Sequence, residues 1–226
     1  MKRLVILVIL FLFYQQLFSQ QNYSGVYGEK KLLSQEDREG YKDLNPDKDD
    51  FGYLTKLILT QVSDKKYKFW LYVCKGFPSY NSGQIDGFIF FEGDSAKFLL
   101  TDSVWGGCKL LFKVKDNSIF VDHDYEYGGC GFGANVIAKG NYPLKSKTVK
   151  TSDIKSIFQY EIEEVVIKST KAFIYKTATD QQSTKQYFIA GDKILNLTDE
   201  GDRIYTEYIS RNGKFISGWI NKADLQ

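Results

Sequence analysis

The sequence predicts an all-β protein made of two β-rich units. Aromatic residues make up 16% of the 226 residues, with 16 Tyr and 17 Phe, and many of them stand in short runs with Val and Ile. Aromatic and β-branched side chains pack well on a pleated surface, so this composition favours strands. Glycine and polar clusters separate the runs at short intervals, which is typical of an antiparallel barrel or sandwich.

The first 19 residues have the pattern of an export signal. Lys2 and Arg3 precede an apolar run from Leu4 to Tyr14, and the small residue Ser19 stands near its end. A basic start, an apolar stretch and a small residue at the cleavage point are typical of a signal peptide. The apolar run is shorter than the roughly 20 residues that a membrane-spanning helix needs. We therefore expect a periplasmic or extracellular protein with no membrane span after signal removal.

Removal of residues 1–19 also changes the charge balance. The chain has 30 basic and 28 acidic residues, and the predicted signal contains two of the basic ones, which leaves 28 of each. A balanced chain lacks the basic surface that attracts nucleic acids and anionic membranes, so we expect no nucleic-acid partner. We also expect no cofactor and no metal. The one histidine, His123, limits histidine-based catalysis to a single position.

Residues 20–147 are predicted to form an antiparallel β-barrel, with a sandwich as the alternative. Turn-forming pairs such as Asp116-Asn117 separate the apolar runs. In the run Tyr67–Cys74, large side chains alternate onto both faces, which favours a curved sheet closing over a core. The expected strands are 24–27, 54–62, 67–74, 83–92, 96–101, 109–114, 118–122 and 135–142.

Three cysteines allow one disulfide bond in an exported chain. Cys108 begins an apolar run, Cys130 lies in a glycine cluster, and the turn at Asp116-Asn117 folds the intervening runs back on each other. We predict a Cys108–Cys130 disulfide, which stabilises the fold by roughly 3 kcal/mol in the chain-entropy model. Cys74 is predicted to be a small buried hydrophobic residue.

The polar segment 148–164 is predicted to be a linker with room for one short helical turn. Residues 165–226 then form the second unit, with expected strands at 165–168, 187–197, 203–209 and 215–220. Asn212-Gly213 stands between two apolar runs, which is a strong hairpin signal.

Four motifs in the second unit appear in the order typical of a bacterial SH3 domain. They are Lys171–Tyr175, Ala190–Ile194, Gly218-Trp219-Ile220 and Ala223–Leu225. The unit resembles that family, although the family's aromatic residue after a Gly-Asp turn is missing at Gly201-Asp202. The resemblance implies a small SH3-like barrel that binds peptidoglycan, a cell-wall peptide or an envelope protein, and it does not imply catalysis. The predicted ligand-binding residues are Tyr175, Tyr187, Tyr205, Tyr208 and Trp219, of which alternate ones are expected to fill the core.

The glycine cluster of the first unit supports a second interpretation. Cys130–Val136 followed by Gly140-Asn141-Tyr142 resembles small exported calycin-like (lipocalin-like) barrel proteins, some of which inhibit hydrolases such as lysozyme. A tight loop in which glycine supplies positive φ is the structural alternative for the same residues.

Two other segments are candidates for chemistry. His123 has Asp122, Asp124 and Cys130 nearby in the sequence, so that a carboxylate can orient its imidazole or Cys130 can pair with it as a nucleophile. An envelope hydrolase that uses His123 is therefore the enzymatic alternative. The acidic segment Asp43–Asp50 lacks the glycine and glutamate that a calcium loop needs, so a surface loop is expected there. We expect a non-enzymatic binding protein, with a hydrolase inhibitor and a hydrolase as the alternatives.

Overall fold

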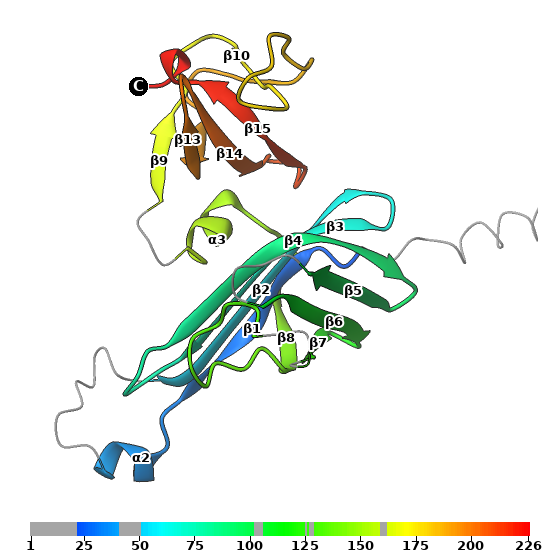
Figure 1. Cartoon of the computed structure of the whole chain (residues 1–226), viewed down its shortest axis with the longest axis vertical. Helices are drawn as coiled ribbons and strands as arrows, with labels where there is room; N and C mark the ends of the chain where they lie inside the picture. The colour runs from blue at the N-terminus through cyan, green and yellow to red at the C-terminus, as the bar shows by residue number, and fades with distance from the viewer. Residues whose placement is uncertain (1–21, 41–50, 102–105, 125, 127–128, 159–161) are drawn as a thin grey trace, which may run out of the picture.

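Eight antiparallel strands form a closed barrel in the first unit, followed by smaller antiparallel sheets in the second (Figure 1). The computed structural model describes residues 22–40, 51–101, 106–124, 126, 129–158 and 162–226. The predicted signal at 1–19 and the acidic segment Asp43–Asp50 lie outside the described residues. Within these residues, no helix is long and apolar enough to cross a membrane. The all-β prediction is confirmed, and the barrel rather than the sandwich is observed.

The barrel is an up-and-down meander in which each strand pairs with the next. Its last strand returns to the first through Val26↔Ser146 and Tyr27↔Leu144, which closes the sheet. A short helix, α2 (Gln35–Gly40), follows the first strand. The strands are β1 (Gly25–Leu32), β2 (Phe51–Ser63), β3 (Lys66–Lys75), β4 (Ser82–Glu92), β5 (Ser95–Leu100), β6 (Cys108–Lys115), β7 (Ser118–His123) and β8 (Gly140–Ser146).

Aromatic side chains fill the interior of the barrel. Phe69 is fully buried, and its ring centroid lies 5.2 Å from that of Phe112 and 5.0 Å from that of Phe98. Tyr67 and Phe91 meet edge to face in the same core. Barrels of eight strands are narrow enough for side chains to fill them, and these large rings do so here.

The eighth strand begins five residues later than the sequence predicts. Strand pairing starts at Gly140, whereas the segment before it is irregular and contains Asn135 with a φ of +60°. Val136 and Ala138 in that segment are nonetheless buried in the barrel core. The apolar residues of 135–139 therefore correctly indicated burial, but the backbone of this segment is not a strand.

The second unit consists of short strands around a mostly aliphatic core. Two isolated bridges, Ile167↔Leu225 and Tyr175↔Trp219, join its sheets. The predicted hairpin at Asn212-Gly213 connects the two longest strands, with Gly213 at a φ of +78°. The elements are β9 (Glu163–Val166), β10 (Ala172–Phe173), β11 (Tyr187–Phe188), β12 (Lys193–Asn196), β13 (Thr198–Glu200), β14 (Arg203–Ile209), β15 (Phe215–Asn221) and the 3-10 helix η2 (Lys222–Asp224).

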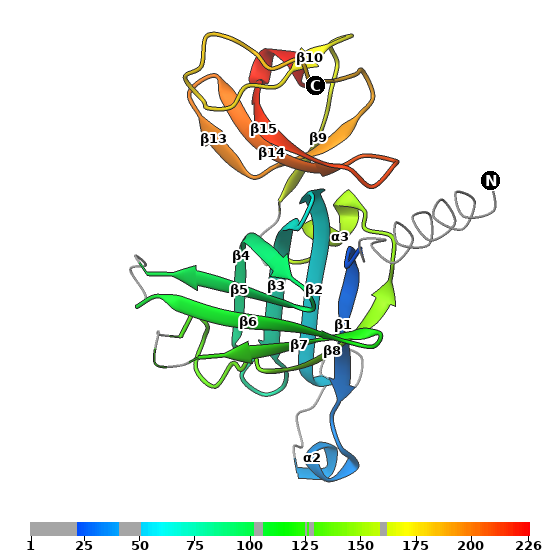
Figure 2. The ribbon, with the colours of Figure 1, turned by 90° about the vertical axis from the view of Figure 1, so that its right-hand side faces the viewer.

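The second unit packs on the outer surface of the barrel, with helix α3 (Thr151–Lys155) beside the junction (Figure 2). Ile154 of α3 lies in one buried cluster with Trp70 of the barrel and with Ile209 and Phe215 of the second unit. Trp70 and Phe215 have ring centroids 5.7 Å apart. Large side chains therefore occupy both faces of β3 because a second layer of protein covers its outer face.

Candidate functional site: an aromatic face on the second unit

Strands β14 and β15 present one face to the small core and the other face outward. On the inner face, Ile204 pairs with Ile220, and both are buried in the aliphatic core. Successive side chains of a strand point to opposite faces, so Tyr205 and its cross-strand partner Trp219 lie on the outer face. Both are half-buried, with ring centroids 5.6 Å apart.

Tyr175 and Arg203 complete this surface. Tyr175 pairs with Trp219 by two backbone hydrogen bonds of 2.8 and 2.9 Å, which places their side chains next to each other on one face. The guanidinium of Arg203 lies 3.6 Å from the centre of the Tyr175 ring. We call the four half-buried residues Tyr175, Arg203, Tyr205 and Trp219 the aromatic face.

Arg203 is held in place by its own hydrogen bonds. Its Nε donates to Asn221 Oδ1 at 3.0 Å, and its Nη1 donates to the carbonyl of Thr177 at 3.1 Å. A cation over an aromatic ring is attracted to the negative face of that ring. These contacts orient the ring of Tyr175 and place a fixed positive charge at the edge of the aromatic face.

Gly218 allows the Tyr175 segment to approach β15. A Cβ atom at position 218 would lie 2.4 Å from Ile174 Cγ2 and 2.7 Å from the Tyr175 carbonyl oxygen, and the φ of Gly218 is +150°. Residues with a Cβ atom rarely adopt that backbone conformation. The three residues of the Gly218-Trp219-Ile220 motif thus have different structural roles. Gly218 leaves room for the Tyr175 segment, Trp219 faces outward and Ile220 packs in the core.

A buried charge network lies next to the aromatic face and joins it to the barrel. Glu207 follows Tyr205 on the same face, where its Oε2 accepts a hydrogen bond of 2.8 Å from Trp70 Nε1. Its Oε1 lies 2.9 Å from Lys68 Nζ and accepts a hydrogen bond of 3.3 Å from the Tyr205 hydroxyl. Lys68 also pairs with Asp86 at the rim of this contact. Tyr205 is therefore anchored through Glu207 to two residues of the barrel.

The electrostatics of the network favour the charged form of Lys68. Burial by itself lowers the pKa of Lys68, but the carboxylates of Glu207 and Asp86 raise it, and the net direction is upward. Burial, followed by the negative charge of Glu207, raises the pKa of Tyr205. The Tyr205 hydroxyl consequently remains a hydrogen-bond donor well above neutral pH.

The structure brings together three of the five predicted ligand-binding residues. Tyr175, Tyr205 and Trp219 share the aromatic face, whereas Tyr208 points to the opposite face and packs edge-on against Phe188 with ring centroids 5.3 Å apart. Tyr187 lies on β11, where it is exposed and contacts Phe173 and Lys171. Of the five, only Tyr208 packs against the core, so the expectation that alternate aromatics fill it holds for one position.

Sequence reasoning missed Arg203 as a member of this surface. It stands two residues before Tyr205 on the same strand, and strand alternation places both on one face. This spacing therefore predicts that Arg203 and Tyr205 share one face of the strand expected at 203–209. The contact of Arg203 with Tyr175 was not predictable, because it depends on how the loop after β10 folds back over β14.

A polar hollow adjoins the arginine side of the aromatic face. Its volume is about 340 Å³, and its lining includes Thr179, Gln181, Asp202 and Asn221 as well as Arg203. The surface therefore combines flat rings, one fixed cation and nearby amide, hydroxyl and carboxylate groups. Such a set can hold an extended chain, with the rings against its apolar parts and the polar groups against its hydrogen-bonding groups.

The barrel contains the predicted disulfide between Cys108 and Cys130. His123 is buried, with Nε2 3.3 Å from Cys130 Sγ, and that sulfur is already bonded to Cys108. The neighbouring acids are engaged by lysines, since Asp122 pairs with Lys139 and Asp124 with Lys109. Cys74 is buried, as predicted. Within the described residues, no group of three or more His, Cys, Asp or Glu side chains is placed to hold a metal ion.

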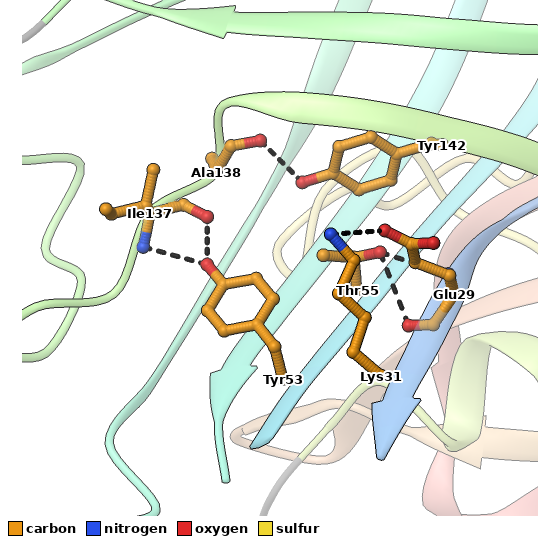
Figure 3. A network of polar contacts seen from close by, with 7 residues as sticks. All are labelled: Glu29, Lys31, Tyr53, Thr55, Ile137, Ala138 and Tyr142. Carbon is orange, nitrogen blue, oxygen red and sulfur yellow. Dashed lines mark hydrogen bonds and ion pairs between the residues drawn. The ribbon is translucent and has the colours of Figure 1, made fainter. Parts of the chain in front are cut away.

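The glycine-rich segment packs into one end of the barrel. Tyr53 anchors the chain after it, because its hydroxyl bonds to the carbonyl of Ile137 and accepts a hydrogen bond of 2.9 Å from the Ile137 amide (Figure 3). Nearby, the Tyr142 hydroxyl donates to the Ala138 carbonyl at 2.7 Å. Phe132 contacts Gly83 so closely that a Cβ atom there would lie 2.2 Å from its ring. These contacts support a structural role for the segment. Positive φ occurs there at Gly131, as expected of glycine, and also at the non-glycine residues Cys130 and Asn135.

Comparison with known proteins identifies no relative. No family model matches the chain, and no curated protein or solved structure is significantly similar to it.

Proposed function

We propose that this is an exported, non-enzymatic protein whose SH3-like second unit binds a cell-wall peptide or an envelope protein through the aromatic face. The observation that carries the proposal is the position of Tyr175, Tyr205 and Trp219 outside a core that is already filled by aliphatic side chains. Rings that the core does not need, and that remain half-exposed side by side, offer contact area at little cost in conformational entropy.

The arrangement of the second unit supports the SH3-like assignment. Its strands are short and antiparallel, and Tyr175 and Trp219 meet next to the long loop between β10 and β11. SH3 domains bind extended peptides in grooves lined by aromatic side chains. The up-and-down connection of eight strands likewise supports a calycin-like assignment for the first unit.

Export is part of the proposal. It rests on the signal-like residues 1–19 and on the Cys108–Cys130 disulfide, since disulfides persist in oxidising compartments. Fractionation of cells that produce the full chain tests it. Recovery of the shortened protein outside the cytoplasm is expected, and a full-length cytoplasmic protein contradicts export.

The binding test is co-sedimentation of the mature chain, residues 20–226, with insoluble peptidoglycan at low salt. The whole mature chain is required, because the second unit shares a buried cluster with the barrel. The Tyr205→Ala, Trp219→Ala double variant is expected to bind at least about tenfold more weakly, since each buried aromatic anchor contributes on the order of 1–2 kcal/mol.

The matched control is the Phe173→Ala, Tyr187→Ala double variant. It removes two exposed rings from the same unit but from a separate contact pair. It is expected to bind within about twofold of the wild type. Equal losses in the two variants contradict binding through the aromatic face, and no binding by the wild-type chain overturns the peptidoglycan ligand. Release of soluble fragments from the wall that depends on His123 would replace the proposal with a hydrolase.

A further inference from the structure

A second cleft lies between the two units at the opposite end of β14 and β15 from Arg203. Barrel residues including Ser24, Thr60 and Gln61 form one wall. Lys147, which directly follows barrel strand β8, also lines the cleft, and the hairpin residues Arg211–Lys214 of the second unit form the other wall. The volume of the cleft is about 550 Å³, which is within the usual range for small-molecule sites.

The charged residues that line this cleft are all cationic. They are Lys147, Arg211 and Lys214, and no carboxylate is among the described lining residues. Over the residues that the structure describes, none of the three forms an ion pair. Three like charges around one hollow repel each other, and an anion between them removes that repulsion. This concentration is local, since the mature chain as a whole is predicted to be neutral.

The backbone around the cleft is fixed by hydrogen bonds. Ser24 Oγ accepts from the amide of Gln61 at 2.9 Å on the barrel side. On the hairpin side, Ser210 Oγ accepts from the amide of Lys214 at 3.0 Å. Thr151 Oγ1 accepts from the amide of Ile209 at 3.0 Å, which ties the base of the hairpin to α3. The cations are therefore presented from two supports whose relative position is set by the interface.

We propose that this cleft binds a phosphoryl group carried by a compound the size of a sugar phosphate. Arginine presents a planar fork of donors that matches phosphate oxygens, and lysine adds point charge. Three cations suit a group that bears nearly two negative charges at neutral pH. The cleft is larger than a phosphate ion, and its remaining lining includes Ser24, Thr148 and Asn212, whose polar side chains can form hydrogen bonds to hydroxyl groups.

The test is titration calorimetry of the mature chain at constant ionic strength. The probes are glucose 6-phosphate, inorganic phosphate, glucose and citrate. We expect saturable binding of glucose 6-phosphate and no binding of glucose. The Lys147→Gln, Arg211→Gln, Lys214→Gln variant is expected to lose about tenfold or more in affinity, because charge-assisted hydrogen bonds are lost.

The control replaces three exposed lysines elsewhere with the same change in net charge. Lys97→Gln, Lys113→Gln, Lys185→Gln keeps the cleft intact and is expected to bind within about twofold of the wild type. Circular dichroism checks that both variants are folded.

The other possible results of the calorimetry either support or overturn the phosphoryl site. Inorganic phosphate binding as tightly as glucose 6-phosphate supports the phosphoryl site and shows that the sugar adds nothing. Overturning results are binding of citrate without binding of either phosphate compound, equal affinity in the cleft variant and the wild type, or no saturable binding at all.

Discussion

The barrel and the second unit use their aromatic residues in opposite ways. In the barrel, long strands such as the 13-residue β2 surround a core that is larger than that of the second unit and is filled by Phe69, Phe112 and other large rings. In the second unit, strands of two to seven residues surround a core made mainly of Ile, Val and Ala. A small core has room for few rings, so Tyr175, Tyr205 and Trp219 remain outside, where they are available to a ligand.

The contact between the two units buries an aromatic ring that lies outside the barrel core. Trp70 points away from the barrel core and is nevertheless buried, because Glu207, Phe215 and α3 cover it. The same outer face of β14 and β15 is thus buried at Glu207 and half-exposed at Tyr205. Docking on the barrel therefore divides one sheet face into a structural part and a candidate binding part.

The largest expected effect comes from the barrel core. Phe69→Ala should lower the free energy of unfolding by about 3–5 kcal/mol, because it opens a cavity at a fully buried ring. Tyr205→Ala on the aromatic face should cost about 1 kcal/mol or less, because this ring is only half-buried. Urea denaturation measures both, and equal losses would contradict the contrast between an aromatic core and an aromatic surface.

The charge network at the interface should come next. Glu207→Ala leaves Lys68 buried without its main partner and removes the acceptor of Trp70 Nε1, so a loss of about 3 kcal/mol is expected. Asp86→Ala at the half-exposed rim is the comparison and should cost less than about 1 kcal/mol. Thermal unfolding distinguishes them. A small effect at Glu207 would mean that the two units are only loosely joined.

Gly218→Ala should destabilise the second unit by about 1–3 kcal/mol, because the added Cβ atom meets Ile174 and the Tyr175 backbone. The bridge between Tyr175 and Trp219 should weaken, and the proposed binding to peptidoglycan should weaken with it. Gly140→Ala, where a Cβ atom meets nothing within 4 Å, is the matched control in the barrel. Hydrogen exchange at the Tyr175 and Trp219 amides reports the bridge directly, and unchanged protection in Gly218→Ala would refute this role.

The smallest effect concerns Tyr27 and depends on pH. Its hydroxyl donates to the Tyr23 carbonyl at 2.8 Å, so Tyr27→Phe should cost about 1 kcal/mol at neutral pH. Burial, followed by the neighbouring Tyr67 and Tyr23, raises the pKa of Tyr27 to about 12.

The sign of the pH effect follows from that raised pKa. The unfolded chain releases the Tyr27 proton near pH 10, whereas the folded barrel retains it up to about pH 12. The contribution of Tyr27 to stability is therefore complete below pH 10 and is lost as the pH rises through that window. Unfolding measured at several pH values should show the deficit of Tyr27→Phe shrinking toward pH 12, and a constant deficit would contradict it.

Strand positions were largely predictable, because alternation and turn chemistry are local. The runs 54–62, 67–74 and 83–92 match β2, β3 and β4 closely, and Asn212-Gly213 marks the hairpin. The Cys108–Cys130 pairing was also predictable, since the turn at 116–117 aligns the strands on either side. The eighth strand was misplaced at 135–139, where burial occurs without strand geometry. The expected strand 187–197 is divided into β11 and β12 by a turn in which Gly191 has a φ of +89°. In the candidate site, three of five predicted residues meet, and Arg203 was missed.

By itself, the sequence determined the all-β class, the approximate positions of most barrel strands and the identity of the disulfide. Those features depend on residue type and on spacing along a short stretch of chain. Tertiary structure alone decided which face of each strand is covered. Trp70 and Glu207 are 137 residues apart, and nothing near either residue specifies the other. Period-2 alternation defines two faces of a strand but does not say which one meets water. Docking of the two units decided which part of the outer face of β14 and β15 is covered, and it formed the cationic cleft between them.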